Sequence, residues 1–143
     1  MTDTWTKEFR SEIMSRIHSK NTKPEMLVRR LIHGMGYRYR LHVKELPGTP
    51  DIVMISKRKI VEVRGCFWHG HAGCTDARIP KTRSEFWVKK INNTKKRDAS
   101  NSEKLEMDGW EILEIWECEL RNVSNLKSRI STFINKENLL NRK

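Results

Sequence analysis

The stretch EVRGCFWHGHAGC, residues 62–74, concentrates the chemically active side chains of this sequence. It holds an acidic residue, an arginine, two adjacent aromatic residues, two histidines and two cysteines. Cysteine and histidine are the usual ligands of a structural zinc ion, whereas acidic and basic side chains in one place are typical of a catalytic centre. We therefore expect a metal site and a second functional group of side chains to meet in this segment.

A zinc site is predicted from the order of the surrounding elements. A strand at 59–64, a long helix and a strand at 110–117 form a crossover unit, in which the two strands should be parallel and adjacent. The cysteines that follow these two strands would then meet at one edge of the sheet. Three thiolates and one imidazole suit a closed tetrahedral zinc site with a structural role, and the alternative is a set of buried thiols with an unrelated histidine. The four candidate ligands are Cys66, His71, Cys74 and Cys118.

The residues around this unit predict an α/β domain with the element order α, β, β, β, α, β, α. Thr22 and Glu25, and again Thr82 and Glu85, have the spacing of a helix capping box, and Ser100 is a candidate break in the second helix. Residues 1–21 are polar and are expected to form an arm, and 22–143 a single domain. The expected elements are a helix at 22–36, strands at 37–43, 51–56 and 59–64, a helix at 85–109, a strand at 110–117 and a helix at 123–136.

Composition indicates the partner. The 143 residues include 29 Lys and Arg against 18 Asp and Glu, which gives a net charge of +11. A polyanion such as nucleic acid is the expected partner, and a surface charged for solubility is the alternative. No apolar stretch approaches the length of a membrane span and no secretory leader is readable, so a cytoplasmic, nucleoid-associated protein is expected.

A second group of side chains predicts a cation centre. Glu62 and Arg64 alternate with apolar residues, so they share one face of their strand, and Asp51 at the start of the preceding strand can reach that face. Two carboxylates and the backbone carbonyl of Val63 would bind a hard cation such as Mg²⁺. Such a cation activates water and stabilises the charge that builds on an attacked phosphodiester, and Arg64 would steady the phosphate. Ordinary surface charge is the alternative.

Six motifs resemble one family of nucleases. The stretches MSRIHSKNTKPE, LPGTPDIV, GCFWHGH, TRSEFW, RD at 97–98 and GWEILEIWEC are similar to those of the very short patch repair (Vsr) mismatch endonucleases, over residues 10–121. That family is a branch of the restriction-endonuclease-like, PD-(D/E)XK fold. The resemblance implies a Mg²⁺-dependent endonuclease that nicks double-stranded DNA 5′ to the mispaired thymine of a T:G mismatch.

The resemblance also implies roles for single residues. Asp51 would be the main metal-binding carboxylate, with a second metal contact from the backbone of Val63. His69 would be the general base or orient the attacking water, Asp98 would belong to the outer shell of the metal, and Glu25 would lie near the same centre. The four zinc candidates fall on the family's structural zinc ligands. Aromatic side chains that wedge into the base stack beside the mismatch would be Phe67, Trp68 and Trp87.

Other residues are assigned with less detail. The arm from Met14 to Lys20 and the loop 71–81 are candidates for reading bases, and Trp110 and Trp116 are expected in the core. A single mismatch has no two-fold symmetry, so a monomer is expected.

This sequence departs from the family at two positions. Glu62 stands where the family has an apolar residue, and Arg64 stands where it has a histidine. The pair restores an acidic-x-basic motif typical of restriction enzymes, so Glu62 is expected to bind metal and His69 becomes the better candidate for the base. Two alternatives therefore stay open. One is a restriction-type or mobile-element nuclease of the same fold that cuts matched DNA, and the other is a non-catalytic, zinc-dependent DNA-binding module.

Overall fold

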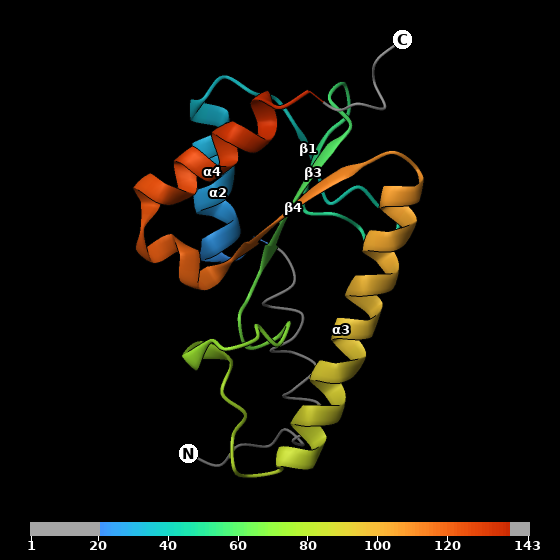
Figure 1. Ribbon diagram of the computed structural model, residues 1–143, viewed down its shortest axis with the longest axis vertical. Helices are drawn as coiled ribbons and strands as arrows, with labels where there is room; N and C mark the ends of the chain where they lie inside the picture. Colours follow the sequence, from blue (N-terminus) through green and yellow to red (C-terminus); the bar gives the residue numbers. More distant parts are fainter. Residues whose placement is uncertain (1–20, 138–143) are drawn as a thin grey trace, which may run out of the picture.

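The computed structural model describes residues 21–137, so Met14, Trp5 and almost all of the predicted arm lie outside the described residues. No helix among residues 21–137 is both long and apolar enough to cross a membrane. The order of the main elements follows the prediction (Figure 1). They are α2 (Lys23–Gly34), β1 (Arg40–Leu41), β2 (Ile52–Met54), β3 (Lys59–Arg64), η1 (Thr75–Ala77), α3 (Ser84–Met107), β4 (Glu111–Trp116), η2 (Glu117–Arg121) and α4 (Val123–Asn135).

The four strands form one mixed sheet in the order β1-β2-β3-β4. The pairs β1/β2 and β2/β3 are antiparallel, and β3/β4 is parallel with Val61 opposite Leu113. The three successive strands predicted before the crossover form an antiparallel meander, and the predicted parallel crossover pair is confirmed. The parallel pair matters most for function, because it brings the ends of β3 and β4 to one edge of the sheet.

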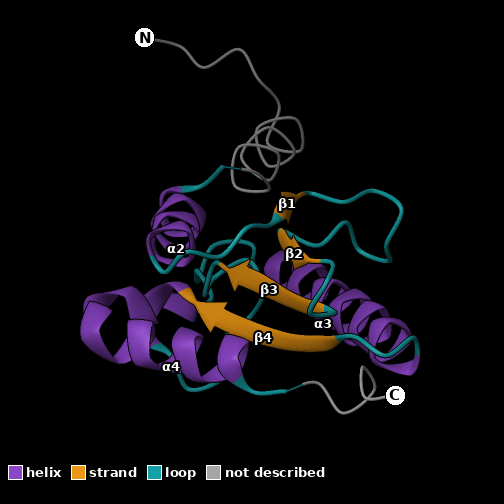
Figure 2. Ribbon diagram, turned by 90° about the horizontal axis from the view of Figure 1, so that it is seen from above, coloured by secondary structure: helices purple, strands orange, loops and turns teal. Residues whose placement is uncertain are grey.

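Helices cover both faces of the sheet (Figure 2), with α2 and α4 on one side and α3 on the other. Successive side chains of β3 point to opposite faces of the sheet and pack in both apolar layers. Val61 packs with α2 and α4, whereas Ile60 packs with Leu105 of α3 and with Trp110. Trp110 therefore lies in the core as predicted. The arrangement has three layers, with helices on both faces of the sheet. The apolar side chains buried between the sheet and the helices fix the positions of the strand ends.

Three boundaries differ from the prediction. The strand expected at 37–43 is reduced to Arg40–Leu41, because the N–H of Tyr37 closes the end of α2 and His42 has a left-handed backbone with φ 46°. Helix α3 begins at Ser84 after Arg83, whose φ is 58°, and no side chain caps it. The helix then runs without a break past Ser100.

The first helix keeps half of its predicted capping box. The hydroxyl of Thr22 accepts a hydrogen bond from the N–H of Glu25 at 3.3 Å. The carboxylate of Glu25 instead turns inward, where only 2% of the residue is exposed. Glu25 therefore has the sequence spacing of a helix-capping residue, but its side chain lies in the interior of the protein.

Candidate active site

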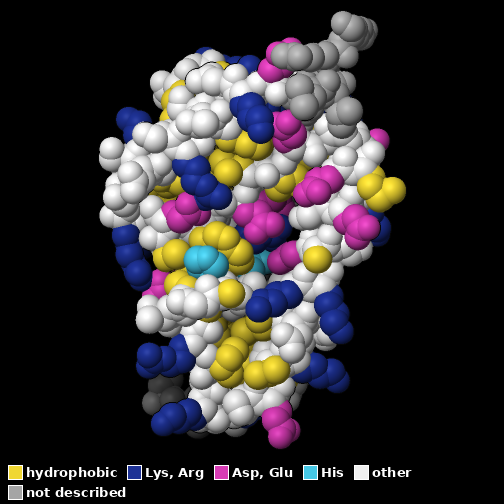
Figure 3. Space-filling model, in the orientation of Figure 1, with side chains coloured by type: hydrophobic (Ala, Val, Ile, Leu, Met, Phe, Trp, Pro, Cys, Tyr) yellow, Lys and Arg dark blue, Asp and Glu magenta, His cyan; other side chains and the backbone are white. Residues whose placement is uncertain are grey.

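An open cleft of about 560 Å³ lies between α3 and the loop that joins β1 to β2. Asp and Glu side chains gather in a hollow in the middle of this face (Figure 3). Several lining residues had no role assigned from the sequence, among them Lys44 and Thr49 of the loop and Thr94, Arg97 and Asn101 of α3. The predicted residues in the lining are Asp51, Glu62, Val63, Arg64, His69 and Asp98.

Asp51 and Glu62 are linked through the backbone where β2 and β3 run side by side. The Asp51 carboxylate accepts a hydrogen bond from the N–H of Val63 at 2.9 Å, and the Glu62 carboxylate accepts one from the N–H of Asp51 at 2.8 Å. Burial and the nearby charge of Glu62 raise the pKa of Asp51 to about 7. Burial also raises the pKa of Glu62 to about 7, against the opposing effect of Arg64. Two adjacent, half-buried acids with raised pKa values are typical of a site that holds a cation.

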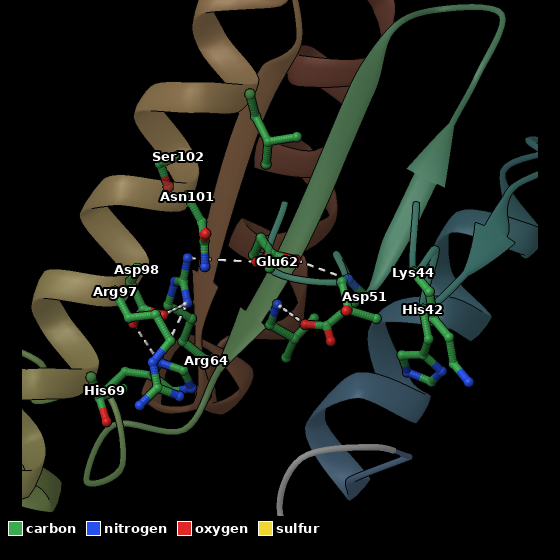
Figure 4. A pocket seen from close by; sticks show the side chains of 15 residues that line it. His42, Lys44, Asp51, Glu62, Arg64, His69, Arg97, Asp98, Asn101 and Ser102 are labelled. Carbon is green, nitrogen blue, oxygen red and sulfur yellow. Dashed lines mark hydrogen bonds and ion pairs between the residues drawn. The ribbon is translucent and has the colours of Figure 1, made fainter. Parts of the chain in front are cut away.

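Arg64 lies at the bottom of the cleft with 6% of the residue exposed. Its guanidinium contacts Asp98 at 3.1 Å, Glu114 at 3.5 Å and Glu62 at 3.6 Å. It comes from the end of β3, whereas Asp98 comes from the middle of α3 (Figure 4). Arg64 thus ties the helix to the sheet across the cleft.

His69 pairs with Asp98. The Nδ1 atom of His69 is 2.7 Å from a carboxylate oxygen of Asp98 and 3.3 Å from a guanidinium nitrogen of Arg64. A guanidinium nitrogen can only donate, so Asp98 is the group that accepts from Nδ1. This arrangement fixes the ring and leaves Nε2 as the nitrogen that can accept a proton.

His42 was missed in the sequence. Its Nε2 lies 3.0 and 3.2 Å from the two carboxylate oxygens of Glu25, and ligand atoms of Glu25, His42 and Asp51 all lie within 4.8 Å of one another. In an extended strand His42 would share the solvent face with Arg38 and Arg40, so the residue pattern does not mark it as a site residue. The left-handed turn at His42 is not readable from the residue pattern.

The four predicted zinc ligands come together. Their ligand atoms lie within 4.8 Å of one another, Nδ1 of His71 lies 3.5 Å from Sγ of Cys118, and the N–H of Cys118 points to Sγ of Cys66 at 3.4 Å. Tetrahedral bonds of about 2.3 Å place zinc-bound sulfurs roughly 3.8 Å apart, so the cluster fits a zinc ion. Trp116 was expected in the core, but it is half-buried and its ring stacks on His71 at 4.1 Å and 7°. The stacking holds the imidazole ring in place.

The three predicted aromatic wedges form one cluster at the start of α3. Ring centroids of Phe67, Trp68 and Trp87 lie 5.2 to 5.9 Å apart in edge-to-face arrangements. Phe86, which was not predicted, packs on Trp87 at 5.1 Å. The rings are half-buried and lie beside Lys90, so an apolar surface and a positive charge adjoin each other.

Together these features define a class. A cleft with clustered carboxylates and a histidine–carboxylate pair, in a chain with a net charge of +11, is the arrangement expected of a nuclease. The family model described as DNA mismatch endonuclease Vsr matches residues 2–75. The chain belongs to the Vsr family and is a DNA nicking endonuclease of that family.

Curated relatives cover nearly the whole chain. A type II nicking enzyme of Xanthomonas oryzae pv. oryzae is 45% identical over 94% of this chain and 98% of its own length. A type II nicking enzyme of Neisseria meningitidis is 42% identical over 94% of this chain and 95% of its own length. The DNA mismatch endonuclease Vsr of Escherichia coli is 36% identical over 92% of this chain and 84% of its own length.

Proposed function

We propose that this protein cuts one strand of duplex DNA by hydrolysis at the Asp51 cleft, on a restriction-endonuclease-like core. The observation that carries the proposal is the junction of β2 and β3, where the Asp51 carboxylate accepts from the N–H of Val63 and the Glu62 carboxylate accepts from the N–H of Asp51. Oxygen ligands of this kind fit Mg²⁺, and we assign Asp51, Glu62 and the carbonyl of Val63 as its ligands. A bound Mg²⁺ would supply activation of water and stabilisation of the phosphorane charge.

His69 is the proposed general base. Its Nδ1 is committed to Asp98, so Nε2 would take the proton from the attacking water. Arg64 was predicted to steady the phosphate. Its contacts with three carboxylates instead support a role in which Arg64 positions Asp98 and Glu62. The arginine would thereby keep the base at a fixed distance from the cation site.

The substrate is the point on which the relatives divide. The two at 45% and 42% identity are type II nicking enzymes, which favours the restriction-type alternative over mismatch repair. The aromatic cluster of Phe67, Trp68 and Trp87 favours a T:G mismatch as the second candidate, because inserting rings costs less beside a poorly stacked pair. A duplex made in T:G, T:A and C:G versions, with nicking followed in Mg²⁺, separates the two. Equal nicking of all three would exclude mismatch selectivity.

The cysteine–histidine cluster is proposed to hold a structural Zn²⁺. Cys66 is buried, and burial raises the pKa of its thiol to about 12, so the metal-free residue stays protonated and a bound Zn²⁺ would have to displace this proton. The ion would fix the segment that carries both His69 and the rings of Phe67 and Trp68. We propose that the protein acts as a monomer.

The catalytic assignment is tested by Asp51→Ala. The variant is expected to lose nicking in Mg²⁺ by several orders of magnitude while binding the same duplex, because Asp51 is proposed to hold the cation rather than the DNA. A variant that nicks at the wild-type rate would show that the centre lies elsewhere.

A further inference from the structure

We propose that Glu25, His42 and Asp51 form a binding site for a divalent first-row transition metal ion, with the imidazole of His42 as a nitrogen ligand. The inference deepens the proposed nuclease function, on which it rests through Asp51. It names a ligand and a class of metal ion that the residue pattern did not indicate.

The distances resemble those inside a metal coordination shell. An octahedral ion with bonds of about 2.1 Å places neighbouring ligand atoms roughly 3.0 Å apart and opposite ones roughly 4.2 Å apart. Nε2 of His42 lies 3.0 and 3.2 Å from the Glu25 oxygens, and all three residues offer ligand atoms within 4.8 Å of one another. Little movement is needed to bring these atoms around one ion.

Three separate elements fix the three side chains. Glu25 lies in the first turn of α2, His42 follows β1 and Asp51 precedes β2, and the N–H of His42 donates to the carbonyl of Asp51 at 3.0 Å. The left-handed backbone at His42 turns its ring toward Glu25 instead of along the strand face. A positive φ is uncommon outside glycine, but histidine adopts it more readily than most residues, so this backbone is compatible with His42.

Charge also favours a cation at this place. Glu25 is almost fully buried, and its carboxylate has Arg29 at 3.3 Å as a further partner. Removing the carboxylates of Glu25 and Asp51 from water costs free energy unless positive charge is nearby. Within residues 21–137, Arg29 contacts Glu25 but not Asp51. Asp51 lies between His42 and Glu62 in Figure 4, so an ion bound by His42 would lie on the side of Asp51 away from Glu62.

The nitrogen ligand decides the class of ion. Mg²⁺ and Ca²⁺ prefer oxygen ligands alone, whereas imidazole suits Fe²⁺ and the later ions of the first transition series, and Mn²⁺, which also favours carboxylates, is the first and weakest-binding ion of that series. A site with two carboxylates and one imidazole should therefore bind Mn²⁺ more tightly than Mg²⁺. The cysteine-rich cluster cannot account for such binding when it is filled with zinc.

The test uses the full-length, zinc-loaded protein and Mn²⁺ as the probe. Free Mn²⁺ is titrated by electron paramagnetic resonance, and electron spin echo modulation reports a nitrogen bound to the Mn²⁺. The wild type is expected to show histidine nitrogen and about tenfold tighter binding of Mn²⁺ than of Mg²⁺. His42→Gln and His42→Asn are expected to lose the nitrogen signal and about tenfold in Mn²⁺ affinity, the second because asparagine accepts a left-handed backbone.

The matched control is His33→Gln, on the exposed surface of α2, which should leave both readouts unchanged. Zinc content and melting temperature show that each variant folds, and ¹⁵N-labelled histidine in the wild type confirms the nitrogen without any substitution. A wild type without a nitrogen signal, or His42 variants that keep it, would overturn the inference. If the protein nicks DNA in Mg²⁺ but shows no histidine nitrogen bound to Mn²⁺, only the metal-site inference is overturned. If the nitrogen signal is present but no nicking occurs, only the nuclease proposal is overturned.

Discussion

At the level of single residues, Asp51 and Glu62 combine two demands that oppose each other in the free protein. Their carboxylates must be charged to hold a cation, yet burial raises the pKa of each to about 7. A carboxyl group with a pKa higher in the folded than in the unfolded state stabilises the fold at low pH, and this stabilisation is lost as the pH rises through the folded value. The metal-free site should therefore weaken the fold at neutral and higher pH.

Asp51→Asn should remove this effect. In magnesium-free buffer at pH 8, with zinc retained, the variant is expected to be more stable than the wild type by about 1 to 2 kcal/mol, because an amide can still accept from the Val63 N–H. Melting temperatures at pH 5 and pH 8 measure it. The gap between variant and wild type should be smaller at pH 5, and a gap that is larger there would contradict the assigned cause.

Trp68 tests the aromatic cluster. Trp68→Ala is expected to lower the preference for T:G over matched duplex by about tenfold, because a stacked ring contributes about 1 to 3 kcal/mol per base. The ratio of nicking rates on the two duplexes is the measurement. Trp110→Phe is the matched control, since Trp110 is buried in the core far along the chain from the cluster. An unchanged ratio in Trp68→Ala would leave the cluster with a packing role only.

Single residues also show how far the sequence could be interpreted. The roles expected of Asp51 and Asp98 come from the family resemblance and, for Asp51, also from the strand pattern, and the structure brings both residues into the cleft. The position of His42 depends on one backbone angle, and the partners of Arg64 depend on how α3 crosses the sheet. Neither property is encoded in local periodicity, so neither could be predicted.

At the level of elements, the crossover from β3 through α3 to β4 was the most predictable part of the molecule. Its parallel pairing follows from chain connectivity, so Cys66 and Cys118 could be brought together without any knowledge of side-chain packing. Helix starts were less predictable. Thr82 has the spacing of a cap, but Arg83 takes a left-handed conformation and α3 starts at Ser84.

Zinc removal should act on this unit. A chelator or Cys118→Ser is expected to lower the melting temperature by several degrees and to reduce nicking at least tenfold, because the loop that presents His69 loses its anchor. Inductively coupled plasma analysis, thermal melts and nicking assays measure the three effects. Arg121→Ala, which removes only the exposed contact to Asp76 at 2.5 Å, should keep the zinc and serves as the control. Full nicking by zinc-free protein would contradict the proposed structural role.

The end of α4 depends on a buried lysine from β3. Nζ of Lys59 donates to the carbonyls of Phe133, Ile134 and Lys136, and burial lowers the pKa of Lys59. Lys59→Met should destabilise the fold by about 2 kcal/mol, since the last carbonyls of the helix lose their donor. Chemical denaturation measures the loss, and Lys57→Met at the half-buried hairpin tip is the comparison. Equal stability of Lys59→Met and the wild type would show that water replaces the lysine.

At the level of the whole molecule, positive charge and the acidic cleft have separate tasks. A net charge of +11 favours contact with the DNA backbone, while the carboxylates in the hollow would repel it unless cations are bound. Binding should therefore weaken steeply with salt. The logarithm of the binding constant is expected to fall linearly with the logarithm of salt concentration, with a slope of about −0.9 for each phosphate contacted.

Fluorescence anisotropy of a labelled duplex in calcium buffer, where cutting is not expected, measures the slope. Lys95→Ala and Lys96→Ala on exposed positions of α3 should each reduce the slope by roughly one if they contact phosphates. Unchanged slopes in both would place the DNA on another face of the molecule.

Helix α3 fixes the distance between Trp87 and Asp98, two residues of the proposed site. Trp87 lies near the first turn of α3 and Asp98 lies further along the same helix, so a rise of about 1.5 Å per residue would set the spacing between the proposed aromatic contact and the proposed place of hydrolysis. Lengthening the helix between these residues by one turn would shift that spacing by about 5.4 Å. If both assignments hold, the length of one helix determines which bond is cut relative to the bases that the aromatic rings contact.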